Sequence, residues 1–151
     1  MTPNTDLNDT LFSPIPVIAP LGTNTMGESF NVNADWAASR LASALKVQQM
    51  IFLTDQTGIL DARKMPIKDI SQGQLEQLVE DEVVTGGMYT KSLTILHALE
   101  HGVQSIRVMS AADCVDALYN DRIGTWCLNE RIYQKIGKKP AAEKAPDYAS
   151  V

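Results

Sequence analysis

Apolar residues along the chain recur at two spacings, one typical of helices and one typical of strands. Within residues 34–47, 72–82 and 88–101 they recur every three or four positions, which predicts three helices. Residues 50–54 (MIFLT) form a continuous apolar run, as in a strand buried on both faces, and residues 105–109 (SIRVM) predict a second strand.

Capping residues support the predicted helix ends. Either Asn31 or Asn33 can cap the first helix, Ser71 can cap the second, and Gly102 follows the third as a C-terminal glycine.

The remaining segments are weaker signals. Residues 15–20 (IPVIAP) are a short apolar run closed by Pro20 and Gly22, residues 111–120 predict a helix, and residues 124–128 (GTWCL) a last short strand. Strands that alternate with helices require crossover connections, and hence a mainly parallel sheet. We therefore predict an α/β fold, a three-layer α/β/α domain in which ligands bind at the carboxyl ends of the strands.

Composition narrows the class of protein. The chain has 151 residues, a net charge of -5 and 44% hydrophobic residues, which suits one soluble domain. The negative net charge argues against nucleic acid or an anionic membrane as the main partner, because both are polyanions. No apolar run is long enough to span a bilayer, and the first twenty residues lack the pattern of a signal peptide. Cys114 and Cys127 fit no metal site, so we expect reduced thiols in a cytoplasmic protein.

Three loops carry candidate chemistry. They are NVNAD at 31–35, LTDQTGILD at 53–61 and EVVTGGMYTK at 82–91. Taken alone, each also fits a plain structural role: a capped helix with an acidic first turn, a turn held by Asp55, or a flexible cap followed by a snorkelling lysine. The phosphate-binding pattern GxxxxGK[ST] is absent from the chain.

The third loop suggests an anion site. Gly86 and Gly87 can let backbone N–H groups approach an anion at a helix N-terminus. Lys91 shares a helix stripe with Ile95 and Ala98, which should face the sheet. We therefore expect the Lys91 side chain to point toward the strand ends.

The segments IPVIAPLG, FNVNADWAASRLASAL, MIFLTDQTGILD, VVTGGMYTK and IGTWCL, in this order and spacing, resemble the C-terminal part of the acetylglutamate kinases of the amino acid kinase family. These enzymes use ATP to phosphorylate the side-chain carboxylate of N-acetylglutamate in arginine biosynthesis. The resemblance covers residues 14–128, with 14–47 matching the end of the N-terminal lobe and 48–128 the nucleotide-binding lobe. Residues 1–13 are then a lead-in, and residues 129–151 an extension that starts as a possible short helix and becomes rich in Lys, Ala and Pro.

The resemblance implies a role for each matching residue. Asn31 would help to hold acetylglutamate, Asp35 would orient the catalytic lysines, and Lys91 would contact the transferring phosphoryl group. The residues implied to border the nucleotide are Thr54, Asp55, Gly58, Ile59, Gly86, Gly87 and Met88. The implied cofactor is ATP, with Mg²⁺ carried by the nucleotide and no metal-binding residue in the protein.

The chain also departs from the family pattern. The family enzymes are nearly twice as long, and their first half holds glycine-rich loops, another catalytic lysine and an arginine that grips the substrate carboxylate. We therefore expect half an active site, completed by a complementary N-terminal half or within a homo-oligomer. Arginine-sensitive members carry an N-terminal helix, and a histidine and an acidic residue near the last strand. This chain has Arg122 before IGT, so arginine feedback is not implied.

Three functions stay open at this point. The first is the ATP-binding half of an acetylglutamate kinase. The second is a non-catalytic module that acts through nucleotide binding or protein contacts. The third is a related kinase for another acyl amino acid or a carbamate, against which the NVNAD segment favours acetylglutamate.

Overall fold

A computed structural model describes residues 15–136 of the chain, so the predicted lead-in and residues 137–151 of the predicted extension lie outside the described residues. The strands and helices are β1 (Leu21–Thr23), β2 (Ser29–Asn31), α1 (Ala34–Ala44), β3 (Gln49–Thr54), β4 (Asp69–Ser71), α2 (Gln72–Glu80), α3 (Gly86–Glu100), β5 (Ser105–Ser110), β6 (Thr125–Leu128) and α4 (Glu130–Ile136). The predicted short helix after residue 129 is confirmed as α4.

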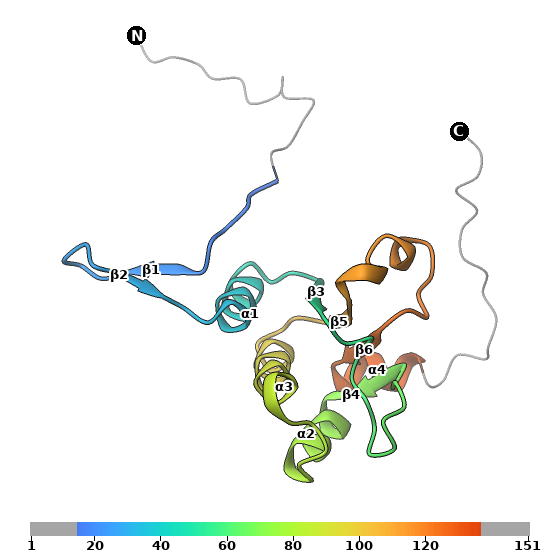
Figure 1. The fold of residues 1–151 in the computed structure, drawn as a ribbon. Coiled ribbons are helices and arrows are strands. Elements are labelled where there is room, and N and C mark those ends of the chain that lie inside the picture. Colours follow the sequence, from blue (N-terminus) through green and yellow to red (C-terminus); the bar gives the residue numbers. More distant parts are fainter. Residues whose placement is uncertain (1–14, 137–151) are drawn as a thin grey trace, which may run out of the picture.

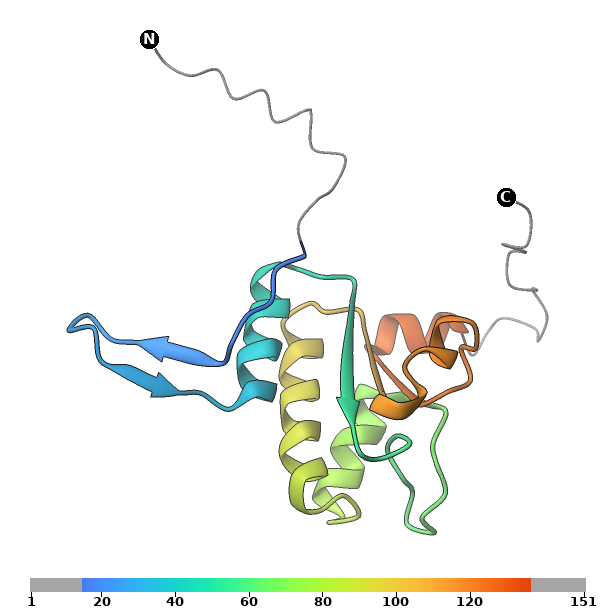
Figure 2. The ribbon, with the colours of Figure 1, turned by 45° about the horizontal axis from the view of Figure 1, so that its top comes forward.

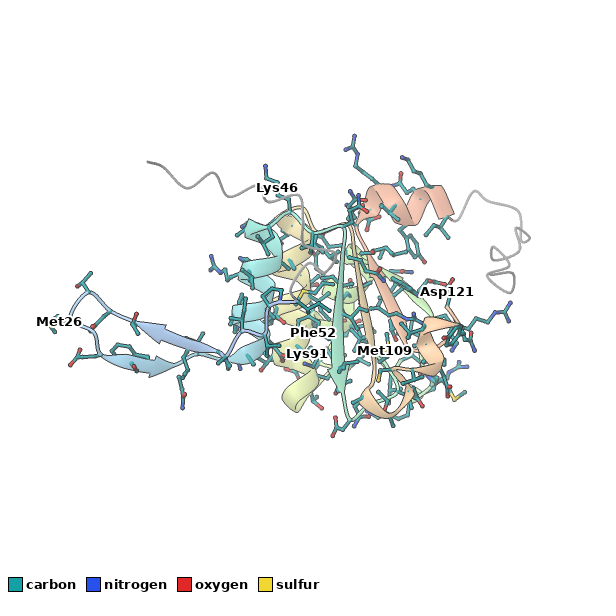
Figure 3. The ribbon with its side chains drawn as sticks, turned by 90° about the horizontal axis from the view of Figure 1, so that it is seen from above. Met26, Lys46, Phe52, Lys91, Met109 and Asp121 are labelled. Atoms are coloured by element: carbon teal, nitrogen blue, oxygen red, sulfur yellow. The ribbon has the colours of Figure 1, made fainter. Side chains whose placement is uncertain are left out.

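The main sheet has four strands in the order β3-β5-β6-β4. The pairs β3–β5 and β4–β6 are parallel, and β5–β6 is antiparallel. Helices α1, α2 and α3 lie on one side of the sheet, and the segment between β5 and β6 lies on the other with α4 (Figures 1 and 3). The predicted three-layer α/β/α fold with a mainly parallel sheet is confirmed. Strand β4 was not predicted, because its three residues are too few for a periodic signal.

Strand β3 corrects one expectation. Phe52 is 5% exposed and faces the helices, but Ile51 and Leu53 are each 51% exposed on the other face. The strand is therefore not buried on both faces as predicted. The reason is its position: among the described residues β3 is an edge strand, and its outer face is only half covered.

The predicted helix caps are observed. Asn33, rather than Asn31, caps α1, and its side-chain oxygen accepts a hydrogen bond from the Trp36 amide at 3.1 Å. Ser71 and Gln74 form a reciprocal capping box at the start of α2. Gly102 follows α3 with a φ of 99°, a left-handed conformation that glycine adopts easily.

Residues 111–120 do not form the predicted helix. They contain two short 3-10 helices, Ala111–Asp113 and Asp116–Leu118. The cause is Arg107, a 5% exposed side chain on β5 whose guanidinium lies over the Trp126 ring. It donates hydrogen bonds to the carbonyls of Ala117, Asn120 and Ile123 at 2.9, 2.6 and 3.0 Å. These bonds hold the segment in a folded loop that a continuous helix could not follow.

The first described residues form an arm. Strands β1 and β2 pair antiparallel and project away from the body of the molecule (Figure 2). The apolar run at 15–20 is not a strand, since Pro16 and Pro20 have no N–H group to donate to a sheet. A two-stranded hairpin is marginal by itself, and the arm exposes Leu21 and Phe30 to 62% and 52%.

The core lies between the helices and the sheet. Its fully buried side chains include Ile59, Leu75, Ile95, Ile106 and Val108. Cys127 also lies here as a free thiol, and burial raises its pKa well above the ordinary value.

Thr125 fixes the loop after β3 to the sheet. Its buried hydroxyl accepts a hydrogen bond from the Ile59 amide at 2.8 Å and donates one to the Ile67 carbonyl at 2.6 Å. We expect Thr125→Val to lower the free energy of unfolding by about 1–3 kcal/mol, because the buried Ile59 amide and the partly buried Ile67 carbonyl lose their partner. Urea denaturation measures the loss. Thr125→Ser, which keeps the hydroxyl, is the control, and an equal loss in both variants would contradict this explanation.

Candidate functional site

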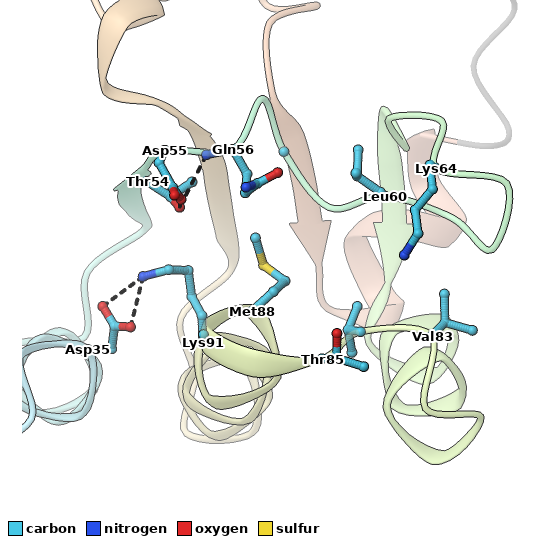
Figure 4. Close-up of a pocket in the computed structure, with 13 residues that line it drawn as sticks. Asp35, Thr54, Asp55, Gln56, Leu60, Lys64, Val83, Thr85, Met88 and Lys91 are labelled. Atoms are coloured by element: carbon cyan, nitrogen blue, oxygen red, sulfur yellow. Dashed lines mark hydrogen bonds and ion pairs between the residues drawn. The ribbon is translucent and has the colours of Figure 1, made fainter.

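A cavity of about 470 Å³ opens where β3 ends and α3 begins (Figure 4). This volume is within the range of small-molecule sites, roughly 300–1,000 Å³. Seven of the residues singled out in the sequence line it: Asp35, Thr54, Asp55, Gly58, Gly87, Met88 and Lys91. Two helices and the loop after a strand thus bring three separate sequence segments to one site.

Asp35 and Lys91 form an ion pair at one end of the cavity. The Lys91 amino group lies 2.8 Å from both carboxylate oxygens of Asp35. The two side chains are 27% and 12% exposed, respectively, so the pair is partly shielded from water. Asp35 lies in the first turn of α1, where the helix dipole favours a carboxylate.

The packing of α1 against α3 sets this geometry. Between the helices, the buried Ser39 hydroxyl donates a hydrogen bond to the Thr94 carbonyl at 2.8 Å. The Lys91 amino group also lies 4.6 Å from the centre of the Phe52 ring. The lysine therefore points toward the end of β3, as its helix stripe predicts.

The loop after β3 forms a second wall. The Thr54 hydroxyl donates a hydrogen bond to the Asp55 carboxylate at 3.0 Å and accepts one from the Gln56 amide at 3.4 Å. Gly58 has a φ of 152°, and a Cβ atom there would lie 2.6 Å from the Thr125 hydroxyl oxygen. This wall consequently requires glycine at position 58.

The start of α3 forms the third wall. Gly86 and Gly87 are its first two residues, and Gly86 has a φ of 57°. The N-cap residue Thr85 makes no side-chain cap, so the first amides of α3 have no intrahelical partner. A Cβ atom added at Gly87 would meet open space, which leaves room for a ligand close to the backbone.

Three of the predicted residues do not line the cavity. Asn31 is exposed on β2 in the arm, Ile59 is fully buried in the core, and Gly86 lies beside the lining residue Gly87. Their predicted roles toward substrate and nucleotide stay predictions.

Six lining residues were not predicted: Gln56, Leu60, Lys64, Val83, Val84 and Thr85. All but Lys64 lie within or directly beside the two predicted nucleotide loops. Their position in the sequence, next to predicted site residues, could therefore have identified them. Lys64 lies in the turn after the first loop, and nothing in its sequence context pointed to the cavity.

The charges at the cavity are few. Lys91–Asp35 is the only ion pair among residues 15–136, and Asp55 and Lys64 are the other charged residues lining the cavity. No group of three or more His, Cys, Asp or Glu side chains in the described part of the chain is placed to hold a metal ion. No helix in that part is long and apolar enough to cross a membrane.

The fold and the cavity define an α/β domain with a cavity of small-molecule size where a strand leads into a helix. The sequence matches the amino acid kinase family over residues 4–110, and the chain belongs to this family.

Similar sequences carry the name acetylglutamate kinase. The protein from Trichlorobacter lovleyi is 45% identical over 108 residues, which are 70% of this chain and 37% of that protein. The protein from Aquifex aeolicus is 42% identical over 95 residues, 63% of this chain and 32% of that protein. The chain thus spans about a third of the length of these curated relatives.

Solved structures agree on the fold. An N-acetylglutamate synthase from Neisseria gonorrhoeae, complexed with coenzyme A and N-acetyl-glutamate, has a TM-score of 0.68 at 24% identity, covering 74% of this chain and 27% of that one. Carbamate kinase from Giardia lamblia bound to AMP-PNP has a TM-score of 0.61 at 21% identity, covering 73% and 37%.

Proposed function

We propose that this chain is the ATP-binding part of an acetylglutamate kinase-like enzyme. The complete enzyme would transfer the γ-phosphoryl group of ATP to the side-chain carboxylate of N-acetylglutamate, in arginine biosynthesis. The observation that carries the proposal is the Asp35–Lys91 ion pair at the end of a cavity bordered by the loop after β3 and the start of α3. Relatives named acetylglutamate kinase at 40–45% identity support the choice of reaction.

The proposal gives this cavity part of what phosphoryl transfer requires of a protein. That reaction depends mainly on positioning and on stabilising the charge of the transferring group, rather than on covalent chemistry. Asp35 holds the Lys91 amino group in place, so the cation is positioned before the nucleotide binds. The amides at Gly87 and Met88 add positive potential at a helix N-terminus. ATP would bring its own Mg²⁺.

The proposal includes a partner. Acetylglutamate would bind on the Asn31 side, and a complementary N-terminal half or a second copy of the chain would complete the site. The open outer edge of β3 and the apolar arm support this part of the proposal. A cytoplasmic location stays a prediction.

Nucleotide affinity tests the proposal directly. We expect the chain to bind ATP weakly, and Gly87→Val to weaken binding because a side chain would fill the open space beside the backbone. Lys91→Ala should weaken ATP more than AMP, by about 1.5–3 kcal/mol for ATP, since its charge is aimed at the terminal phosphates. Calorimetric titration with ATP and AMP measures both effects.

Asp35→Asn should behave differently from Gly87→Val and Lys91→Ala. It removes a negative charge from the cavity, so ATP affinity should stay the same or rise slightly. If wild-type chain binds no ATP, or if Gly87→Val and Lys91→Ala bind ATP as wild type does, the nucleotide site is refuted. A non-catalytic module that acts through protein contacts would then be the better hypothesis.

A further inference from the structure

Lys64 is held in a backbone conformation that few lysines adopt. Its φ is 62°, in the left-handed region that glycine and asparagine enter more easily. The turn around it is well bonded: the Asp61 carboxylate accepts hydrogen bonds from the amides of Arg63 and Met65, both at 2.8 Å, and the Lys64 amide donates to the Asp61 carbonyl at 2.9 Å. The turn therefore fixes where this side chain begins.

The Lys64 side chain lines the cavity. Figure 4 shows it reaching from the turn toward Thr85, where α3 begins. No acidic side chain within residues 15–136 forms an ion pair with it, whereas the Asp35 carboxylate is paired with Lys91. Lys64 is thus the uncompensated cation of the described cavity.

Lys64 and Lys91 lie at opposite ends of the cavity (Figure 4). The apolar side chains of Leu60 and Val83 lie at the Lys64 end, and Met88 lies between the two lysines. An apolar surface with one cation suits a flat base joined to a sugar phosphate, while the Lys91 end suits the terminal phosphates.

We propose that Lys64 binds the ribose and α-phosphate of the nucleotide, the portion that AMP, ADP and ATP share. This proposal rests on the proposed function of the cavity. It assigns the two lysines to different ends of one ligand, with Lys91 sensing the terminal phosphates and Lys64 the nucleoside monophosphate.

Lys64→Gly tests the assignment, because it removes the amino group and relaxes the left-handed backbone. Lys46→Gly is the matched control: Lys46 is also exposed, has a φ of 52°, follows the far end of α1 and does not line the cavity. We expect both variants to keep or slightly raise Tm. Only Lys64→Gly should weaken binding, by about tenfold, and equally for AMP, ADP and ATP in calorimetric titration.

Two further variants separate charge from loop flexibility. Lys64→Asn fits the left-handed backbone without a charge and should lose affinity like Lys64→Gly, whereas Lys64→Arg should retain most of the wild-type affinity. The proposal is overturned if Lys64→Asn binds all three nucleotides as wild type does, or if the loss grows from AMP to ATP. In both cases wild-type binding still supports the nucleotide site, whereas a wild-type chain that binds none of the three refutes the proposed function itself.

Discussion

Purified chain mixed with ATP and N-acetylglutamate is expected to release no ADP above background. At the described cavity the chain supplies two cations, Lys91 and Lys64, and only Lys91 is positioned by a carboxylate. The family resemblance assigns further glycine-rich loops, a second catalytic lysine and a substrate-binding arginine to sequence that this chain does not match. Groups that act as a unit in catalysis are strongly non-additive, and loss of one charge-stabilising group alone costs about 10²–10³ in rate.

A coupled assay of ADP release, with and without N-acetylglutamate, measures this prediction. Lys91→Ala is the negative control, since it removes the cation that we propose contacts the transferring group, and circular dichroism checks that the variant is folded. Acetylglutamate-dependent turnover by wild type that disappears in Lys91→Ala would contradict the prediction, and would mean that copies of the chain complete one another's site. ATP binding that never leads to turnover, even with a complementary half added, would favour the non-catalytic module.

The fold was predictable wherever local signals were strong. Helices α1, α2 and α3 follow from apolar spacing, and the capping residues Asn33, Ser71 and Gly102 mark their ends. The segment at 111–120 was not predictable, because its shape depends on Arg107, whose guanidinium binds carbonyls 10 to 16 residues further along the chain. Local spacing contains no information about such a contact.

The site was predictable in part for a related reason. Asp35 and Lys91 are 56 residues apart, and their pairing depends on how α1 packs against α3. Both residues were nevertheless predicted, because the three loops together resemble the acetylglutamate kinases. Lys64 was missed because its significance depends on a backbone angle and on the direction of the side chain. The exposure of Ile51 and Leu53 was missed because an edge strand and a central strand have the same apolar sequence pattern.

The second large effect is expected on self-association through strand β3 at the edge of the sheet. Among the described residues β3 pairs only with β5, so its outer side presents unpaired backbone N–H and C=O groups. Ile51 and Leu53 lie half-exposed on the outer face of β3, and the arm exposes further apolar side chains. Unprotected edges and apolar patches of this kind promote pairing with another chain. We therefore expect a dimer or larger assembly at micromolar concentration.

Sedimentation velocity on three proteins tests this expectation. The double variant Ile51→Lys/Leu53→Lys should shift the assembly to monomer and raise its dissociation constant about 100-fold or more, because two apolar side chains worth about 1.5–3 kcal/mol each on burial become charges. Ile136→Lys is the control: Ile136 is 48% exposed, close to the 51% of Ile51, but belongs to α4, which packs beside β4 at the opposite edge of the sheet. Circular dichroism confirms that each variant is folded. A wild-type monomer at micromolar concentration, or equal effects of the double variant and Ile136→Lys, would show that the β3 edge does not drive assembly.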